Sequence, residues 1–447
     1  MAKFKLLSLF AAVALGFVGL AYGFAYLVAS SRAAAVAEPR PLAATNHSAA
    51  LARTDTPAAA AQIAFWSKRV AGDAGAYIDL TYLAQAYARK ARETSDVGYY
   101  VRAEAALRRA LRVNPRYVQA KASLSTVLFS LHEFDKALAT ARPIVDDPRG
   151  VQALATLGDA NLALGQYARA QAAYDRLVAW AATPAGFSRL ALLADLRGRT
   201  DEALMLMDRA AKLAQESGEY GESLAWYAYQ IGELSFKAAR IDLAESHYRA
   251  ALRLFPEYPL ALGGLARARA AQGDYQAAIR LYRRATEIVP QPDLVAALGD
   301  VYAATGRTSE AREQYGTVEL IGKLARVNRQ VYNRQLATFY ADHDLRLGEA
   351  LRLALGELRV RKDVYGFDAA AWALHKNGMH VRARQLVERA LSVGTRDPRL
   401  YYHAGMIAKA QGRTAEARSL LSDALRMNPH FDVLQAPLAR AALDELA

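Results

Sequence analysis

The sequence predicts an all-helical protein built from repeated helix pairs, and three observations lead to this expectation. Ala and Leu dominate the 447 residues, and no segment alternates Val, Ile and Thr as a strand would. Apolar side chains recur at helical spacing. A pattern of 34 residues, from Pro259 to Pro292, recurs on both sides of that stretch. Periods of this length are typical of solenoids, in which each repeat packs mainly on its neighbours.

The stretch from Pro259 to Pro292 contains two amphipathic helices joined by a turn at Gly273. Small Ala266 and Ala278 stand where these helices should cross, because only small side chains allow helix axes to approach within roughly 8 to 10 Å. The residues that share a face are Leu262, Leu265, Ala266 and Arg269 in the first helix and Tyr275, Ala278, Tyr282 and Ala285 in the second. This spacing resembles the tetratricopeptide repeat.

About ten units of this kind can be aligned between Tyr77 and Phe431. The resemblance implies a right-handed superhelical solenoid of helix-turn-helix tetratricopeptide repeats, a fold that specifies packing and carries no chemistry of its own. The eighth unit is degenerate, with an altered turn between Ala341 and Ala350, and one interruption lies at Gln215–Ser223. The later units resemble an exported bacterial group of such proteins.

Composition and periodicity divide the chain into five parts. A transmembrane anchor or signal peptide is expected at residues 1–31, followed by a flexible Ala/Pro-rich tether at 32–56. We expect a capping helix at 57–76, the repeat array at 77–431 and a second capping helix at 432–447. Caps are needed because one side of a terminal repeat faces solvent.

The N-terminal segment decides the expected location. The uncharged stretch Leu6–Ser31 follows two lysines and is long enough to cross a bilayer, so we favour a retained anchor. The alternative is a signal peptide cleaved after Ala37. The first alternative predicts a single-pass protein of the cell membrane with its repeats on the extracytoplasmic side, and the second a secreted or periplasmic protein.

The formal net charge of +13 would favour anionic partners such as acidic proteins, lipid head groups or polysaccharide. These charges are scattered along the helices without a basic block, so nucleic acid is not an expected partner. The chain has no cysteine, which excludes disulfides, thiol catalysis and cysteine-ligated zinc.

No motif in the sequence predicts an enzyme or a cofactor site. The Gly322-Lys323 pair lacks the rest of a phosphate-binding loop, and no serine lies in a complete nucleophile elbow. Two groups could hold a metal, namely His375 with His380 and the run Asp342-His343-Asp344. The helical i, i+4 histidine pair of zinc sites is missing, so no metal is expected.

The resemblance also implies where a partner would bind, because five positions of each first helix face the concave side in this family. The residues carried over to these positions are Phe129, Trp226, Tyr229, Glu233, Phe236, Lys237, Tyr365, Asp368, Trp372, His375 and Tyr402. Aromatic rings with a few charges suit a peptide-binding groove. The alternative for each ring is packing between repeats. The first unit has Thr81 and Gln85 where family members that clamp chaperone C-termini carry lysine and asparagine, so that activity is not expected.

These observations predict a non-enzymatic scaffold of the cell envelope that binds a partner protein or peptide in the concave groove. The alternative is a binder of an anionic envelope polymer or of lipid head groups. The interruption at Gln215–Ser223 should change how the neighbouring repeats stack, with Trp226 and Tyr229 directly after it as candidate anchors. If these two rings face the groove, their loss should weaken partner capture, and if they are core, it should lower stability.

Overall fold

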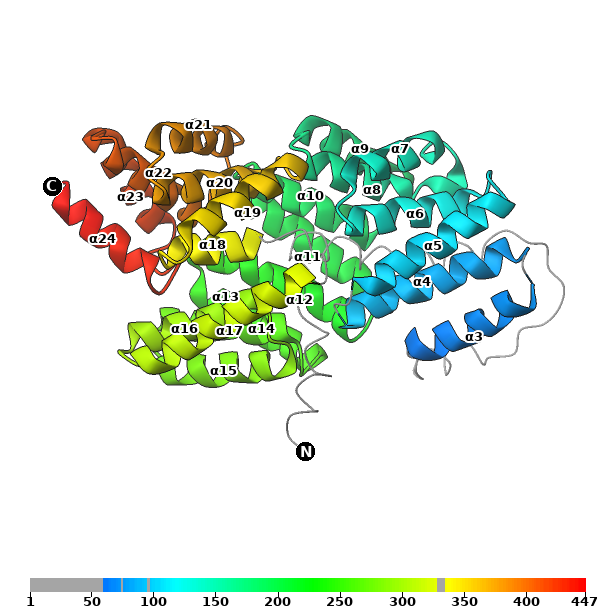
Figure 1. Ribbon diagram of the computed structural model, residues 1–447, viewed down its shortest axis with the longest axis horizontal. Coiled ribbons are helices and arrows are strands. Elements are labelled where there is room, and N and C mark those ends of the chain that lie inside the picture. The colour runs from blue at the N-terminus through cyan, green and yellow to red at the C-terminus, as the bar shows by residue number, and fades with distance from the viewer. Residues whose placement is uncertain (1–58, 74, 95–96, 328–333) are drawn as a thin grey trace. The chain divides into compact units, whose positions relative to one another are not determined.

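The computed structural model describes residues 59–73, 75–94, 97–327 and 334–447, so the predicted anchor and tether lie outside the described residues. These ranges form 22 α-helices and two short 3₁₀ helices (Figure 1). The contacts divide them into an N-terminal unit that ends at Ala160 and a C-terminal unit that begins at Asn161. The predicted all-helical repeat solenoid is confirmed for this part of the chain.

The described part of the N-terminal unit contains a leading helix, two helix pairs and most of one further helix. Trp66 stacks on Tyr82 with ring centroids 4.8 Å apart, which joins the first helix to the second. Its helices are α3 (Ala59–Gly72), α4 (Tyr77–Thr94), α5 (Gly98–Val113), α6 (Val118–Ser130), α7 (Phe134–Ala141), the 3₁₀ helices η3 (Arg142–Ile144) and η4 (Pro148–Gly150), and α8 (Ala153–Ala163), which crosses the boundary between the units.

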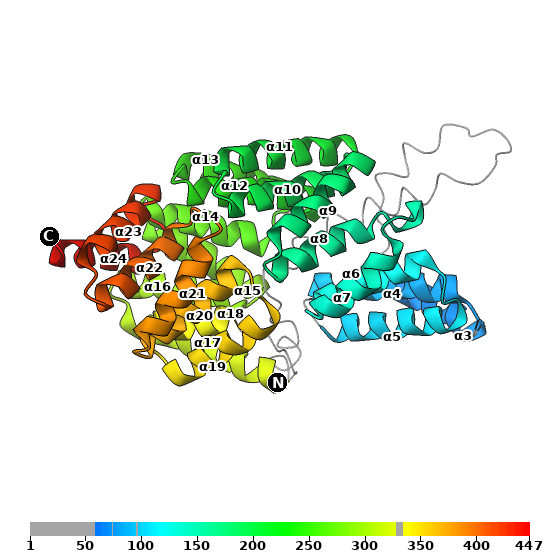
Figure 2. The same cartoon turned by 90° about the horizontal axis from the view of Figure 1, so that it is seen from above.

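The C-terminal unit continues the alternation of first and second helices. Figure 2 shows the second helices α11 and α13 as an outer row against the first helices α10 and α12. Its helices are α9 (Tyr167–Trp180), α10 (Pro184–Leu196), α11 (Thr200–Glu216), α12 (Glu222–Lys237), α13 (Ile241–Leu254), α14 (Pro259–Ala271), α15 (Tyr275–Ile288), α16 (Pro292–Ala304), α17 (Thr308–Val327), α18 (Arg334–Asp342), α19 (Leu347–Val360), α20 (Val364–Lys376), α21 (His380–Leu391), α22 (Pro398–Ala410), α23 (Thr414–Met427) and α24 (Gln435–Glu445).

Local sequence sets the beginnings of the first helices. Pro184, Pro259, Pro292 and Pro398 each occupy the first position of a helix, where the missing N–H costs nothing. Asp363 caps α20 by accepting a hydrogen bond from the Gly366 amide at 2.7 Å.

Glycine makes room for aromatic rings where consecutive repeats meet. Tyr248 of α13 is fully buried between α12 and α14. A Cβ at Gly232 or at Gly264 would lie 2.6 Å or 2.5 Å from its ring. The ring therefore fills space that a larger residue on either first helix would occupy, which is the close crossing that the small residues of the repeat predict.

The altered turn of the eighth unit has a backbone explanation. Asp344 and Arg346 both adopt the left-handed conformation, with φ of 53° and 44°. The sixth unit places Gly273 at its turn, with φ of 82°. This conformation costs non-glycine residues about 1–2 kcal/mol each. Among the described turns His132 and Ala239 also adopt it, but the eighth turn has two such residues, Asp344 and Arg346.

At the predicted interruption, α11 continues to Glu216 and α12 begins at Glu222. Gly218 and Gly221 both have positive φ between them. Among the described helices, none combines the length and apolar character needed to cross a membrane.

The last repeats of the C-terminal unit contact its first helices. The Lys362 amide donates to the Ala163 carbonyl at 2.8 Å, and the Val364 amide donates to the Tyr167 hydroxyl at 2.9 Å. The Thr395 hydroxyl donates to the Leu196 carbonyl. Farther along, the Asn428 side chain donates to the Phe236 carbonyl at 2.7 Å. Segments nearly 200 residues apart are thus joined by hydrogen bonds, and we call this contact the closure.

Candidate functional site

Charged side chains on the first helices pair with partners on the next first helix. Each pair therefore bridges two repeats. The bridges are Asp195 of α10 with Lys237 of α12, Glu233 of α12 with Arg267 of α14, Asp300 of α16 with His343 directly after α18, and Asp368 of α20 with His403 of α22. Because adjacent repeats otherwise meet through apolar contacts, these bridges fix which side chains face each other.

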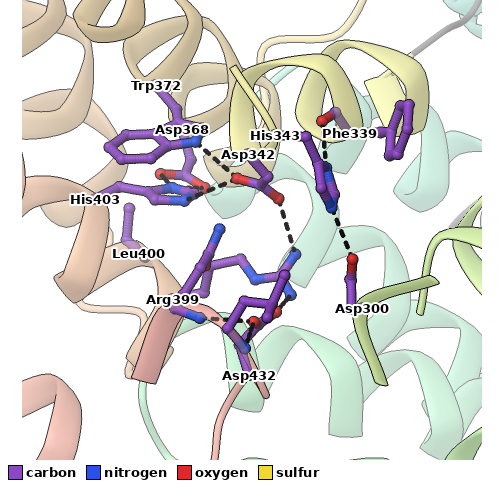
Figure 3. Close-up of polar contacts among 12 residues, drawn as sticks. Asp300, Phe339, Asp342, His343, Asp368, Trp372, Arg399, Leu400, His403 and Asp432 are labelled. Carbon is purple, nitrogen blue, oxygen red and sulfur yellow. Dashed lines mark hydrogen bonds and ion pairs between the residues drawn. The ribbon is translucent and has the colours of Figure 1, made fainter. Parts of the chain in front are cut away.

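The densest group of such contacts lies on α16, α18, α20 and α22 and just before α24 (Figure 3). We call it the carboxylate cluster. It contains four carboxylates, two imidazoles, one guanidinium and one indole, contributed by Asp300, Asp342, His343, Asp368, Trp372, Arg399, His403 and Asp432.

His343 is held from two sides. One ring nitrogen, Nε2, lies 2.7 Å from Asp300 Oδ1, and Nδ1 lies 2.7 Å from the Phe339 carbonyl oxygen. Burial alone would lower the pKa of His343, but the hydrogen bond and charge of Asp300 reverse the sign and raise it. Burial raises the pKa of Asp300, and His343 opposes this effect.

His403 is the most enclosed member of the cluster, with 1% of its surface exposed. Its Nδ1 lies 2.9 Å from Asp368 Oδ1, and its ring stacks on Trp372 at a centroid distance of 4.2 Å. Its Nε2 is buried and makes no hydrogen bond to any described residue. Asp342 Oδ1 lies 4.0 Å from this nitrogen, beyond hydrogen-bond range.

Asp342 occupies the centre of the cluster. It accepts a 2.7 Å hydrogen bond from the Trp372 indole N–H, and its second oxygen lies 4.0 Å from Arg399. Burial raises the pKa of Asp342, while Arg399 and His403 act in the opposite direction. The carboxyl group thus has one firm donor, with Arg399 and His403 each 4.0 Å away.

Arg399 connects the cluster to the last helix. It pairs with Asp432 at 2.6 Å, and the other Asp432 oxygen accepts the amides of Leu434 and Gln435 at the start of α24. Burial would lower the pKa of Arg399, but the surrounding carboxylates raise it well above its usual range. The Arg399 side chain is still 41% exposed, so the cluster is open to solvent on this side.

The two candidate metal groups do not converge. Asp342 contacts Trp372, His343 contacts Asp300, and Asp344 pairs with Lys376 at 2.6 Å. His375 and His380 place their Nδ1 atoms 3.1 Å apart, the distance of a hydrogen bond between rings. Across the described ranges, no group of three or more metal-ligating side chains is arranged around one point.

The structure places most of the predicted groove rings below the surface, which differs from the expected open aromatic groove. Trp226, Tyr229 and Phe236 are buried, with exposures of 5%, 8% and 4%. Tyr229 packs on Tyr248 and Tyr258 in the core between repeats. The packing alternative therefore describes these rings, and the physical reason is that bulky rings on first helices fill the space between adjacent repeats.

The remaining predicted residues fall into two groups. Those that are buried are Phe129 in the N-terminal unit and Asp368, Trp372 and Tyr402 in the C-terminal unit. Those that are partly exposed are Glu233, Lys237, Tyr365 and His375. The structure brings Asp368, Trp372 and His375 together on α20, where His375 stacks on Trp372 at 5.0 Å. A role in binding a partner remains a prediction for all of them.

The family prediction missed most of the cluster. Asp300 and Glu233 each directly follow a glycine at the helix crossing, Gly299 and Gly232. A recurrent Gly-acid pair was thus a usable signal for inter-repeat bridges. Asp432 has no such signal, because it lies between α23 and α24, outside the first helices, and reaches the cluster only once the chain is folded.

Comparison with known proteins agrees with the helix pairing. Residues 89–148, 229–293 and 369–430 match one family model described as tetratricopeptide repeat, residues 269–327 match a second and residues 151–184 a third. The chain contains tetratricopeptide repeats. No protein of curated function matches the sequence.

Solved structures with similar helical repeats are distant from this tetratricopeptide repeat chain. The crystal structure of the APC/C hetero-tetramer Cut9-Hcn1 is 15% identical, covers 86% of this chain and 92% of its own, and gives a TM-score of 0.34. PilW, a type IV pilus biogenesis factor, is 19% identical over 46% of this chain and 93% of its own, with a TM-score of 0.40. Yeast Tom70 is 13% identical over 87% and 96%, with a TM-score of 0.35. None of these likenesses supports a shared function.

Proposed function

We propose that this tetratricopeptide repeat protein is a non-enzymatic scaffold that binds a cationic segment of a partner protein at the carboxylate cluster. Scaffolds of this fold commonly mediate protein–protein interaction. The observation that carries the proposal is the excess of carboxylates at the cluster, which is open to solvent beside Arg399. A cationic side chain that enters from this side would be attracted by these carboxylates.

Charge determines the kind of partner. The cluster holds four carboxylates against one guanidinium and two imidazoles, whereas the whole chain carries a net charge of +13. The cluster is therefore an acidic site on a basic protein. A Lys or Arg side chain of a partner would be attracted here and repelled by most of the remaining surface.

The partly exposed residues of the predicted groove extend this surface. Tyr365 donates to Asp397 at 3.3 Å, and Lys376 lies 5.3 Å over the Trp372 ring beside His375. We propose that Tyr365 and His375 contact the partner backbone while the carboxylates hold its cation. Rigid rings lose little conformational entropy on binding, which suits them to this role.

A peptide-binding experiment tests the proposal directly. The probes are fluorescent oligolysine and oligoglutamate peptides of equal length, measured by anisotropy at two salt concentrations. Oligolysine should bind and oligoglutamate should not compete at the cluster. Asp342→Asn should weaken oligolysine binding by about tenfold or more, since a charge-assisted contact contributes about 1.5–3 kcal/mol. Asparagine keeps the acceptor for Trp372, so the fold should persist.

The matched control is Asp208→Asn, which removes an exposed carboxylate that pairs with Lys212 outside the cluster. This variant should bind oligolysine like the wild type. Equal affinity of the wild type for both peptides, or an unchanged affinity in Asp342→Asn, would contradict the proposal. In cells, cross-linking should join a Lys- or Arg-rich peptide of the partner to α20–α22.

The location belongs to the same proposal and rests on the sequence. The apolar stretch Leu6–Ser31 would anchor the chain in the cell membrane, with the repeats on the extracytoplasmic side facing an envelope partner. Protein in native membranes should then resist carbonate extraction, and protease added outside should digest the repeats. Recovery of a soluble mature chain that begins at Glu38 would instead establish signal cleavage.

A further inference from the structure

A second charged region lies in the C-terminal unit, away from the carboxylate cluster. An open cleft of about 720 Å³ lies beside the closure, where the start of α9 and the ends of α10 and α21 meet. We call it the junction pocket. Its charged and aromatic lining residues are Tyr167, Arg197, Arg199, Lys362, Phe367 and Arg389. Its volume is in the range of small-molecule sites, about 300–1,000 Å³.

The cations of the junction pocket are mostly unpaired. Arg197 donates to the Gln171 side-chain oxygen at 2.7 Å, a neutral acceptor that leaves its charge uncompensated. Neither Lys362 nor Arg389 has a carboxylate within ion-pair distance among the described residues. Arg199 pairs with Glu202 at 2.7 Å, but both side chains are exposed, so this pair is weak.

Helix ends do not cancel this charge. The C-termini of α10 and α21 face the pocket, and each contributes roughly half a negative charge. The N-termini of α9 and α20 contribute roughly the same amount of positive charge. Two carboxylates lie close to the lining residues, and each is paired: Glu202 with Arg199, and Asp363, whose charge acts on Tyr167, with Arg361. Four full cations therefore dominate the potential, and the site should attract an anion.

We propose that the junction pocket binds a multivalent phosphate group, carried by a small molecule or by a lipid head group. Guanidinium groups donate two parallel hydrogen bonds to phosphate oxygens, and three arginines with one lysine match an anion of more than one charge. Tyr167 and Phe367 supply apolar walls beside the cations, and Arg389 lies 5.7 Å over the Phe367 ring. This site is independent of the proposed peptide site.

The pocket exists because the closure exists. Lys362 reaches it from the loop that donates to Ala163, and Tyr167 accepts a hydrogen bond from Val364 at 2.9 Å. Arg197 and Arg199 come from a turn nearly 200 residues before Arg389. A ligand that contacts both segments would therefore stabilise the closed unit.

The test uses inorganic pyrophosphate and the full chain in detergent or membranes. Calorimetry at constant ionic strength should show saturable binding, and the melting temperature should rise with pyrophosphate because the ligand binds only the folded state. The double variant Arg197→Gln with Arg389→Gln should bind about tenfold or more weakly. Lys362→Gln should weaken binding separately. The control Arg280→Gln removes an exposed arginine of α15 outside the pocket and should bind like the wild type.

Vesicles of phosphatidic acid in phosphatidylcholine distinguish the source of the phosphate. Vesicle binding that pyrophosphate displaces would assign the site to a lipid head group, and pyrophosphate binding without vesicle binding would assign it to a soluble compound. Equal pyrophosphate affinity in the double variant and the wild type would overturn the proposal. Absence of binding in both assays would overturn it as well, with circular dichroism confirming that the variants are folded.

Discussion

The carboxylate cluster and the junction pocket are both charged regions of the C-terminal unit, but they differ in how their charges are compensated. In the cluster, Asp300, Asp368 and Asp432 each have a cationic or imidazole partner within 2.9 Å. In the pocket, Lys362 and Arg389 make no ion pair among the described residues. Three of the four carboxylates of the cluster are thus part of the packing between repeats, and Asp342, with no cationic group closer than 4.0 Å, is the one left for a cationic ligand. The unpaired cations of the pocket are available to an anion.

The two regions also differ in how the chain assembles them. The cluster joins neighbouring repeats, so the two residues of each pair lie a few tens of positions apart, as with Asp368 and His403. The pocket joins repeats that are nearly 200 residues apart, as with Tyr167 and Val364. Loss of a cluster residue should therefore lower stability locally, and loss of the closure should remove the pocket while leaving the repeats helical.

The largest expected effect tests the packing role of the cluster. Trp372→Ala should lower the free energy of unfolding by about 3–5 kcal/mol, because it leaves a cavity and removes the ring on which His403 stacks. Lys362→Ala in the pocket should change it by less than about 0.5 kcal/mol, because that side chain is exposed. Urea unfolding followed by circular dichroism measures both. Similar losses in the two variants would remove the distinction between the regions.

A pH dependence should appear at the edge of the cluster. Burial and the neighbouring His380 lower the pKa of His375 to about 4, below its ordinary value in the unfolded chain. The neutral His375 ring therefore leaves the folded protein at full stability above about pH 6.5. As the pH falls towards 4, the free energy of unfolding should decrease by up to roughly 3 kcal/mol. Asp300 and Asp342 have raised pKa values and act in the opposite direction.

The variant His375→Gln isolates this contribution. The free energy of unfolding is measured for the wild type and the variant at pH 7 and at pH 4.5. Its decrease between the two pH values should be smaller in the variant, by about the contribution of His375. An identical decline in both proteins would show that His375 is not the group responsible.

A smaller effect tests the closure with a matched pair of glycines. Gly165 and Gly273 both have positive φ in the turn of a repeat, but a Cβ at Gly165 would lie 2.4 Å from the Lys362 carbonyl oxygen and a Cβ at Gly273 would meet nothing within 4 Å. Gly165→Ala should therefore be about 1–3 kcal/mol less stable than Gly273→Ala, because only the first is overpacked. Equal stability of the two variants would mean that Lys362 does not lie against this turn.

The sequence predicted the parts of the fold that depend on local spacing. The crossing residues Gly232 and Gly264 and the ring of Tyr248 follow from a repeat of fixed period, and the helix pairs were predicted from it. Several rings predicted to face the groove are instead buried, because rings such as Tyr229 fill the space between repeats. Counting positions within one repeat shows which way a side chain faces but not what later repeats bring against it.

The site was less accessible to prediction than the fold. Trp372 and Asp368 were predicted as binding residues, and Asp342 and His343 as part of a metal group, but their actual partners lie on other repeats. The junction pocket could not be predicted, since it depends on a superhelical rotation that brings Lys362 back to Ala163. The small rotation between neighbouring repeats adds up along the chain, so the sequence of one repeat does not predict the total rotation.

Hydrogen exchange at Lys362 and Val364 tests the closure most directly. Both amides lie at the junction of α19 and α20, where a first-turn amide has no acceptor within its own helix. Their acceptors in the structure are the Ala163 carbonyl and the Tyr167 hydroxyl, at 2.8 Å and 2.9 Å. We predict that both amides are protected in the wild type and that Tyr167→Phe releases Val364 alone. Exchange of both amides at the rate of an unstructured peptide would contradict the closure and, with it, the junction pocket.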